Sequence, residues 1–446
     1  MIHRLHFSLL CCMALLLPMT LSAQGNEVAA SSTSAASEAK ENMVKVDLQM
    51  LSHGEVRNGG MPAVGKDDGS QFMIGRERLI IDFERPGLET RLNIQHSGIW
   101  GQSGKGAFNL YEAWAKMSRY GMFAQIGRVA LAYDDERIIG TNDWAMASLS
   151  HDVLRLGYEG HGHKAHLVLA YNQNAEATLE GGSFYANGAQ PYKSMVTAWY
   201  HYDLPHIPLG ASVLFMNIGM QGGTKEEDPH TEFQQLLGGY LNFHPKHWKV
   251  EGSYYHQFGR DEYGMKINAW MASSKVDWSP SDRFGVEAGY DYLSGDKYFA
   301  VPSEGQIGVT RHEVLRGFNP IYGSHHKFYG AMDFFYISTY VSGFTPGMQN
   351  AFIGLHYRPF NRLTLKGQYH YLATATKLDE MEQTLGHEVE LQASYKFSKD
   401  ISLSAGFSYM TGTETMEKLK RASDDGSLRW GWFSLVISPR LFTNKW

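Results

Sequence analysis

The chain is short of cysteine, of charge and of long apolar runs. Among its 446 residues the only cysteines are Cys11 and Cys12, so everything after them lacks a thiol nucleophile, a disulfide and a cysteine-based metal site. Charged residues make up 19% of the chain, below the roughly 25% of an ordinary soluble domain. Beyond residue 22 no run reaches the about 18–20 apolar residues that a membrane-spanning helix needs. A bundle of transmembrane helices is therefore excluded.

The balance of charge and aromatic residues excludes two further classes. Asp+Glu number 46 against Lys+Arg 40, a net charge of −6, which disfavours a general nucleic-acid binder. An aromatic content of 13% and 47 glycines are untypical of a disordered chain. The length allows two or three soluble domains or one large barrel.

The first residues predict export. Residues 1–23 are typical of a secretory signal peptide, with an apolar stretch from Leu9 to Leu17, a break at Pro18 and a cleavage site after Ala23. The small and polar residues 24–42 predict a flexible periplasmic tail. The remaining residues, 43–446, then form a single domain.

From residue 43 onward, polar and apolar side chains alternate with a period of two. Between Gly75 and Glu84 the polar parity holds Arg76, Arg78, Asp82 and Glu84, and the apolar parity holds Leu79, Ile81 and Phe83. Such strands have one polar and one apolar face. Either the apolar face is buried in a soluble sheet, or it faces lipid while the polar face lines a wet lumen.

Strand length and aromatic placement favour the membrane barrel. The alternating segments run about 10–15 residues, against about 5–6 in globular sheets and 9–11 in membrane-crossing strands. Aromatic residues near the segment ends predict girdles at the membrane interfaces: Trp100, Tyr171, Tyr200, Trp248, Trp278, Tyr357, Tyr371 and Trp432. A soluble secreted β-sandwich lectin remains an alternative.

The connections predict the number of strands. Eight short and nine longer connections alternate along the chain, and seventeen connections join eighteen strands. We place His326 to Tyr336 inside the long outer connection 295–346 rather than in the wall, and we hypothesise that this connection folds into the lumen. The run from Trp430 to Phe442 closes the barrel. The prediction is an all-β transmembrane antiparallel barrel of about 18 strands, with long extracellular loops and short periplasmic turns.

The polar faces predict a mildly basic, arginine-rich lumen. Nine basic residues face inward: Arg76, Arg78, Arg91, Lys116, Arg155, Lys249, Arg362, Lys366 and Lys396. Seven acidic residues share that face: Asp82, Glu84, Glu89, Glu112, Glu251, Glu388 and Glu390. Arginine forks bind carboxylates, so one interpretation is a path for an anionic solute. The other is a ladder of internal ion pairs that stiffens the wall.

Twenty histidines and scattered serines predict neither a metal site nor a catalytic site. His161 and His163 would share a strand face, but no spacing supplies the three or four ligands that zinc wants. No Gly-x-Ser-x-Gly motif is present. We expect no metal, no cofactor and no catalysis, with a barrel enzyme acting on lipid or glycan as an alternative.

Three groups of motifs carry a family resemblance. The first is Gly127-Arg128, then Tyr133-Asp134-Asp135-Glu136-Arg137-Ile138-Ile139-Gly140 and Asn142-Asp143-Trp144. The second is Phe318-Asn319-Pro320 through Gly323-Ser324-His325, then Gly330-Ala331-Met332-Asp333. The third is Leu385-Gly386-His387-Glu388-Val389-Glu390. Their order and spacing resemble the alginate-export family of outer-membrane barrels, over roughly residues 70–446.

This resemblance implies a passive outer-membrane channel in a Gram-negative bacterium, for an anionic polysaccharide or another anionic solute. It adds Arg128 and Arg137 to the candidate pore-lining residues. The motif residues Asp134, Asp143, Trp144, His325, Asp333, Glu388 and Glu390 become site candidates. Asp143 and Trp144 are alternatively residues that pin a loop, and Arg128 and Arg137 alternatively pair with Asp134 and Glu136. The implied partners are outer-membrane lipid, the barrel assembly machinery and the solute, with no nucleic acid and a monomeric state. A general nutrient or ion porin is the alternative function.

Overall fold

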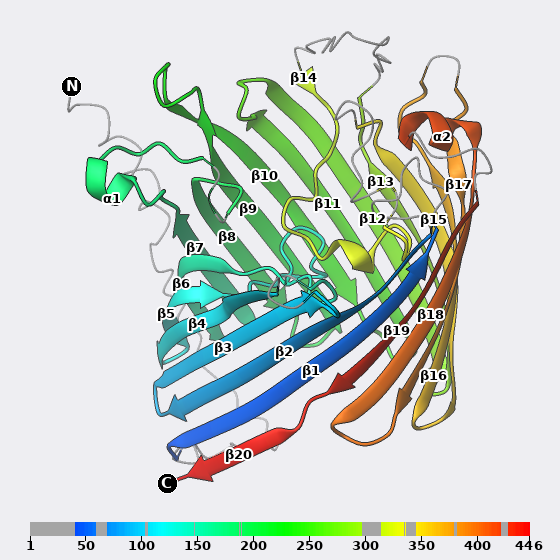
Figure 1. Cartoon of the computed structure of the whole chain (residues 1–446), viewed down its shortest axis with the longest axis horizontal. Helices are drawn as coiled ribbons and strands as arrows, with labels where there is room; N and C mark the ends of the chain where they lie inside the picture. Colours follow the sequence, from blue (N-terminus) through cyan, green and yellow to red (C-terminus); the bar gives the residue numbers. More distant parts are fainter. Residues whose placement is uncertain are drawn as a thin grey trace, which may run out of the picture. The chain divides into compact units, whose positions relative to one another are not determined.

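Eighteen antiparallel strands form a closed wall in the computed structural model (Figure 1). The structure describes residues 41–58, 69–102, 106–146, 148–186, 188, 190–296, 314–333, 335, 345–378, 381–420 and 427–446. Residues from Glu41 to Trp446 belong to one unit. The predicted signal peptide and nearly all of the predicted tail lie outside the described residues, and the first strand begins at Met43.

The first half of the wall contains β1 (Met43–Arg57), β2 (Ser70–Arg85), β3 (Leu88–Ile99), β4 (Ala107–Arg119), β5 (Met122–Val129), β6 (His151–Gly160), β7 (His163–Tyr171), β8 (Ser194–Asp203) and β9 (Leu209–Gly222). The second half contains β10 (His230–Phe243), β11 (Trp248–Arg260), β12 (Lys266–Ser281), β13 (Phe284–Leu293), β15 (Met348–Phe360), β16 (Leu363–Ala373), β17 (Thr384–Lys396), β18 (Ile401–Gly412) and a last strand in two pieces, β19 (Ser427–Ile437) and β20 (Arg440–Lys445).

The wall closes between its first and last strands. Met50 pairs with Ile437 in β19, and Met43 pairs with Lys445 in β20. The last strand is interrupted at Pro439, whose nitrogen has no hydrogen to donate to the ladder. The prediction of an antiparallel barrel with eighteen strands is confirmed. Among the described residues, no helix is long and apolar enough to cross a membrane.

Short turns and long connections alternate as predicted. The turn between β6 and β7 has only two residues, His161 and Gly162, with φ values of 53° and 81°. Two such left-handed residues make the hairpin turn that matches strand twist. His161 is thus a turn residue. The short elements β14 (Val314–Leu315), α1 (Ala177–Glu180), α2 (Glu414–Lys420) and the 3₁₀ turn η1 (His325–Lys327) all lie in the long connections.

The alternation of side chains has the orientation expected of a membrane barrel. Arg76 and Arg78 of β2 are 2% and 4% exposed, whereas Leu79 is 38% exposed. Trp248 and Trp278 are exposed on the outside. Trp432 differs from the predicted girdle. It is buried against the ring of Trp144, because its parity on β19 directs it inward.

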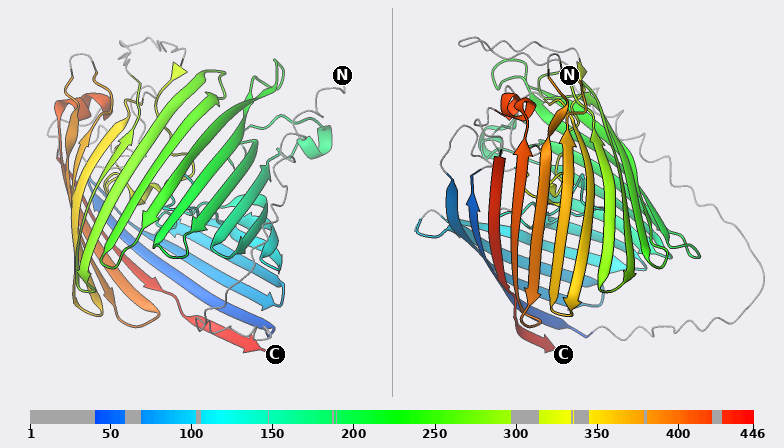
Figure 2. Two further views of the ribbon diagram at one scale, coloured as in Figure 1. Left: turned by 180° about the vertical axis from the view of Figure 1, so that it is seen from behind. Right: turned by 90° about the vertical axis from the view of Figure 1, so that its right-hand side faces the viewer.

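Two connections fold into the ring of strands, as Figures 1 and 2 show. One is the described part, 130–146 and 148–150, of the connection between β5 and β6, and the other is the described part, 316–333, of the long connection between β13 and β15. Asn319 exchanges hydrogen bonds with Gln257 on the inner face of β11. Residues 326–333 contain no wall strand, as predicted from the strand count.

Candidate functional site

The two inward segments are joined by backbone hydrogen bonds. Ile139 and Tyr322 form an isolated parallel bridge, with the Gly140 nitrogen donating to the Tyr322 oxygen at 2.9 Å. The Ser324 nitrogen donates to the Glu136 oxygen, also at 2.9 Å. The segments therefore form one unit inside the lumen, built from residues almost 190 positions apart.

Arg76 and Arg78 hold this unit to the wall. Arg76 Nη1 donates to the backbone oxygens of Asp143 and Ala145 at 2.8 and 2.9 Å. Arg78 donates to Ser148 Oγ at 2.7 Å, pairs with Asp143 at 2.7 Å and lies over the ring of Tyr111. Both guanidinium groups are buried and do not line the larger cavity described below. Asp143 is thus a point at which the first inward segment is attached to β2.

Arg137 joins both inward segments to the opposite wall. Its Nη1 donates to Asp291 Oδ1 on β13 at 2.9 Å and to the Tyr329 hydroxyl at 3.1 Å. Its Nε donates to Asp135 at 3.1 Å, and its guanidinium lies 4.0 Å from the centre of the Phe328 ring. Burial alone would lower the pKa of Arg137, but Asp291, Tyr329 and Asp135 hold that pKa well above its usual value. Arg137 therefore pairs with Asp135 and Asp291, and not with Asp134 or Glu136.

A pair of carboxylates on β17 holds the second segment. Glu388 accepts a hydrogen bond from the Met332 nitrogen at 2.9 Å, and Glu390 accepts one from the Ala331 nitrogen at 2.6 Å. Gly330 has a φ of 92° and lies so close to Glu388 that a Cβ atom would overlap the carboxylate. These two glutamates are anchors for the backbone of residues 330–332.

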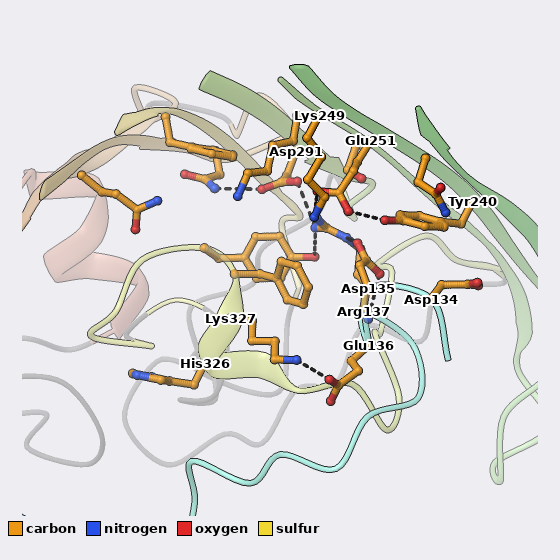
Figure 3. Close-up of a pocket in the computed structure, with 18 of the residues that line it drawn as sticks. Asp134, Asp135, Glu136, Arg137, Tyr240, Lys249, Glu251, Asp291, His326 and Lys327 are labelled. Atoms are coloured by element: carbon orange, nitrogen blue, oxygen red, sulfur yellow. Dashed lines mark hydrogen bonds and ion pairs between the residues drawn. The ribbon is translucent and has the colours of Figure 1, made fainter. Parts of the chain in front are cut away.

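A cavity of about 750 Å³ lies between the inward segments and the wall strands (Figure 3). Its lining has five basic side chains: Arg137, Lys164, Lys249, Lys275 and Lys327. Seven acidic side chains also line it: Asp134, Asp135, Glu136, Asp203, Glu251, Asp291 and Glu390. Acidic side chains therefore outnumber basic ones in this lining, whereas the sequence predicts a mildly basic lumen wall. The difference arises because the first inward segment contributes three consecutive carboxylates, and the alternation of the strands gives no information about an irregular segment.

In most of the lysine–carboxylate pairs at this cavity, the lysine is more exposed to solvent than the carboxylate. Lys249, Lys275 and Lys327 are 46%, 36% and 51% exposed, and their partners Glu251, Glu287 and Glu136 are 14%, 17% and 20% exposed. Figure 3 shows the Lys327 ammonium reaching towards Glu136. In these three pairs the lysine side chain is the more exposed end. Lys164 is the exception, since its partner Asp203 is also exposed.

Hydrogen bonding and burial shift the pKa values of the loop carboxylates in opposite directions. Burial raises the pKa of Asp134, even though Trp199 donates to it at 3.1 Å. Burial would also raise the pKa of Glu136, but hydrogen bonds from Lys327, Ser324 and Thr141 outweigh it and leave that pKa lowered. The pKa of Asp134 is therefore raised and that of Glu136 lowered, although the two residues lie in the same acidic run.

The remaining predicted pore-lining residues belong to the wall. Arg91 binds Asp82 through two hydrogen bonds of 2.7 and 3.1 Å, as the ladder interpretation expects. Lys116 and Arg155 lie over the ring of Phe123 at 4.8 and 5.2 Å. Arg362 lies at the turn before β16, and Lys366 is exposed on β16. None of these residues lines the 750 Å³ cavity.

Arg128 does not face the lumen. It pairs in register with Asp152 and Ala113 and shares its strand face with Ile126, which is 61% exposed on the outside. Its guanidinium binds Asp152 at 2.8 and 2.7 Å. The family motif suggested a lumen position, but the parity of β5 places this arginine on the outer surface.

Two motif residues, Trp144 and Asp333, meet His326 at the other side of the inward unit. Trp144 stacks on His326 with ring centres 4.3 Å apart, and His326 Nδ1 lies 2.7 Å from Asp333 Oδ2. His325 begins η1. His326 is not among the site residues that the sequence predicts, although it is adjacent to the predicted His325. Lys164, Lys275, Lys327 and Asp291 are not among them either. The alternation within their strands would have indicated that Lys275 and Asp291 face the lumen. No local pattern in the sequence distinguishes Lys327.

No group of three or more histidine, cysteine, aspartate or glutamate side chains is arranged to hold a metal ion within the described part of the chain.

Comparison with known protein families identifies the family to which the chain belongs. The family model described as alginate export matches residues 101–411. The chain belongs to the alginate-export family. This match includes all three groups of motifs. The protein is accordingly an outer-membrane β-barrel channel of a Gram-negative bacterium. No sequence among curated proteins matches this alginate-export family member.

Solved barrels with a similar fold are distant in sequence. OccK5 (OpdH) of Pseudomonas aeruginosa is 11% identical, with a TM-score of 0.60 over 90% of this chain and 98% of that one. OccAB1 of Acinetobacter baumannii is 12% identical, with a TM-score of 0.59 over 90% and 97%. OccK2 (OpdF) of Pseudomonas aeruginosa, described in complex with glucuronate, is 11% identical, with a TM-score of 0.59 over 90% and 98%. At such identities the likeness concerns the fold.

Proposed function

We propose that this channel allows passive diffusion of an anionic solute of sugar-acid size, with the exposed lysines of the 750 Å³ cavity as its weak binding groups. The observation that carries the proposal is the asymmetry of the ion pairs. In three pairs an exposed ammonium, on Lys249, Lys275 or Lys327, stands in front of a more buried carboxylate. A carboxylate solute would therefore meet cations first.

Several weak sites suit a conducting pore better than one strong site. Conduction requires binding that is favourable enough for entry and weak enough for exit. Each lysine is already paired, so a solute carboxylate competes with a protein carboxylate and is held loosely. Arg137, whose hydrogen-bonding groups are used by Asp135, Asp291 and Tyr329, sets the position of the inward segments rather than binding the solute.

Cavity size and one distant relative support a small solute. Pockets of about 300–1,000 Å³ typically hold a molecule of small-ligand size, and this cavity measures about 750 Å³. The glucuronate complex of OccK2 concerns a barrel of similar fold with 11% identity, and it supports a sugar acid as the first solute to test. An anionic polysaccharide would have to pass the same constriction as an extended chain. We further propose that the channel is monomeric and carries out no catalysis.

A general nutrient or ion porin is the second candidate. The observation that favours it is the lining count of seven acids against five bases, which would give little discrimination if the carboxylates dominate. An enzyme acting on lipid or glycan is a further alternative, and turnover of such a substrate by the detergent-solubilised protein would reveal it.

The test is ion selectivity of the full-length protein in a planar bilayer under a salt gradient, with and without glucuronate. We expect anion preference and concentration-dependent block by glucuronate. The triple variant Lys249→Gln, Lys275→Gln, Lys327→Gln should lose both. Lys399→Gln, in the exposed turn between β17 and β18, is the matched control and should retain both. Cation preference, or an unaltered triple variant, would refute the proposal.

A further inference from the structure

The wall strands β15 to β18 contain little negative charge. Their only carboxylates are Glu388 and Glu390, and both accept hydrogen bonds from backbone nitrogens of the second inward segment. Three basic residues of β16, of β17 and of the turn before β16 are exposed: Arg362, Lys366 and Lys396. None of these three cations forms an ion pair within the part of the chain that the structure describes.

The alternation of β16 and β17 directs the three cations to the lumen. Lys396 has the same parity on β17 as Glu388, which holds the inward unit. Arg362 and Lys366 have the same parity as Gln368, which lines the 750 Å³ cavity. A two-residue turn precedes β16, and such short turns lie on the periplasmic side of an outer-membrane barrel. The three cations therefore face the periplasmic end of the lumen.

Arg362 and Lys396 stand opposite each other on neighbouring strands. The Lys396 nitrogen donates to the Arg362 oxygen at 2.8 Å, and the adjacent Leu363 pairs in register with Tyr395. Side chains at directly opposite positions have Cβ atoms about 4.5–5.5 Å apart, and like charges there are destabilising. An anion bound between the two groups would remove this repulsion.

A hydroxyl group lies between the cations along β16. Thr364 is two residues from Arg362 and two residues from Lys366 on the same face, and it pairs in register with Ser394. The Thr364 hydroxyl forms no hydrogen bond with another described residue. Two residues of a strand span only about 7 Å, which the long side chains of arginine and lysine can bridge. The three cations and this hydroxyl can thus reach one bound group.

The neighbouring turns do not supply a counter-ion. Arg283 and Arg358 are further exposed cations of this rim, and the Arg358 nitrogen donates to the Arg283 oxygen at 2.7 Å. Asp282 and Asp400 lie in turns of the same rim, but neither forms an ion pair with the three cations among the described residues. The positive charge is therefore left for a solute to neutralise.

We propose that Arg362, Thr364, Lys366 and Lys396 bind a phosphate dianion, either free or as the terminal group of a phosphorylated solute. A phosphate monoester carries about −1.5 to −2 charges at pH 7 and presents three strong acceptor oxygens. The arginine fork suits two of these oxygens, and the threonine hydroxyl and the two ammonium groups donate to the remaining acceptor sites. A monocarboxylate has only two oxygens and would neutralise only one of the three cations.

This patch differs in kind from the larger cavity. There, Lys249, Lys275 and Lys327 each have a protein carboxylate as partner, so an anion must compete for them. In the patch no protein carboxylate competes, so affinity should rise with the charge of the solute. Because the cations are exposed, the binding remains weak enough for release, as conduction requires. The proposal goes beyond the proposed function, since none of the three cations lines the larger cavity.

The test is isothermal titration of the full-length protein in detergent with inorganic phosphate, glucose 6-phosphate and glucuronate. The double variant Arg362→Gln, Lys396→Gln should weaken binding of both phosphates by about tenfold or more. In the variant Lys249→Gln, Lys275→Gln, Lys327→Gln, both phosphates should still bind at least about tenfold more tightly than glucuronate. Arg119→Gln, at the turn between β4 and β5 with its guanidinium over the Tyr120 ring, is the matched control and should bind phosphate as the wild type does.

Equal affinities for glucuronate and the phosphates in the triple variant would overturn the proposal in favour of a cationic wall without preference for a dianion. Unchanged phosphate binding in the double variant would overturn the assignment to this patch, and no phosphate binding to the wild type would overturn it outright. Tighter binding of either inorganic phosphate or glucose 6-phosphate supports the patch and identifies the source of the phosphate group. Glucuronate block in a bilayer should persist in the double variant, so this proposal and the proposed function can fail separately.

Discussion

Arg137 Nη1 and Asp291 Oδ1 lie 2.9 Å apart, although 154 residues separate them in the chain. Their side chains are 7% and 3% exposed. Asp291 is part of the wall strand β13, and Arg137 is part of the first inward segment. This ion pair is therefore one of the attachments that hold the inward segments to the barrel wall.

Arg137→Met should destabilise the protein by about 3–5 kcal/mol, because it leaves Asp291 buried with no cation beside it. The inward segments should also lose their attachment to β13, and the single-channel conductance should rise. Urea unfolding of the folded barrel and bilayer recording measure the two effects. The double variant Arg137→Met, Asp291→Asn should recover a large part of the lost stability, since no charge is then buried alone. Equal stability of the single variant and the wild type would show that the pair does not hold the constriction.

Gly330→Ala tests the second attachment, at β17. The added Cβ would overlap the Glu388 carboxylate, and φ at this position is 92°. Gly101→Ala is the control, with a φ of 82° and no atom within 4 Å of the new Cβ. Both variants incur the backbone penalty of about 1–2 kcal/mol, but only Gly330→Ala should displace residues 330–332 and change the conductance. If both variants changed the conductance equally, backbone strain rather than the overlap with Glu388 would be the cause.

The contact between the two inward segments should weaken in acid. Hydrogen bonds from Lys327 and Ser324 outweigh burial and lower the pKa of Glu136 below its usual 4.5. A carboxylate whose pKa is lower in the folded state than in the unfolded state stabilises the fold at pH values above its unfolded-state pKa. That stabilisation is lost as the pH falls through its folded-state pKa. Proteolysis within residues 130–150 should therefore accelerate as pH falls below about 4.5. Glu136→Gln should remove this dependence, and a dependence that persists in the variant would assign it to another group.

Arg128→Ala should leave ion selectivity unchanged, because the guanidinium is paired with Asp152 on the outer face of the barrel. A partly exposed pair of this kind contributes less than about 1 kcal/mol to stability. Arg78→Ala should instead change the conductance, since Arg78 holds Asp143 and Ser148 of the inward segment. Bilayer recording of both variants provides the comparison, and altered selectivity in Arg128→Ala would place that arginine in the conduction path after all.

The strands were predictable because alternation is a local property. The parity that separates Arg76 and Arg78 from Leu79 and Ile81 can be read from one segment, and the lipid and the lumen impose it on every wall strand. The lengths of the connections then determined the number of strands and excluded the segment from His326 onward from the wall. The position of Trp432 near a segment end predicts a place at the membrane interface, but its parity on β19 directs it inward.

The functions of the inward-facing residues were much less predictable. Arg76, Arg78 and Arg91 share a parity and a chemistry, yet two hold a loop and one binds a neighbouring wall residue. The carboxylates that line the larger cavity include Asp134, Asp135 and Glu136, which lie in an irregular segment where no period applies. The roles of these residues depend on which segments enter the lumen.

The sequence by itself determined the barrel, its eighteen strands and the inner and outer faces of its wall, because hydrophobic patterning at a period of two is imposed residue by residue. Only the tertiary structure decided what fills the lumen. The pairs that matter there join residues more than 150 positions apart: Arg137 of an irregular segment binds Asp291 of a wall strand, and Trp144 and His326 come from two irregular segments. Their geometry arises from packing two long connections against each other and against the wall, and no local pattern in either connection encodes the other.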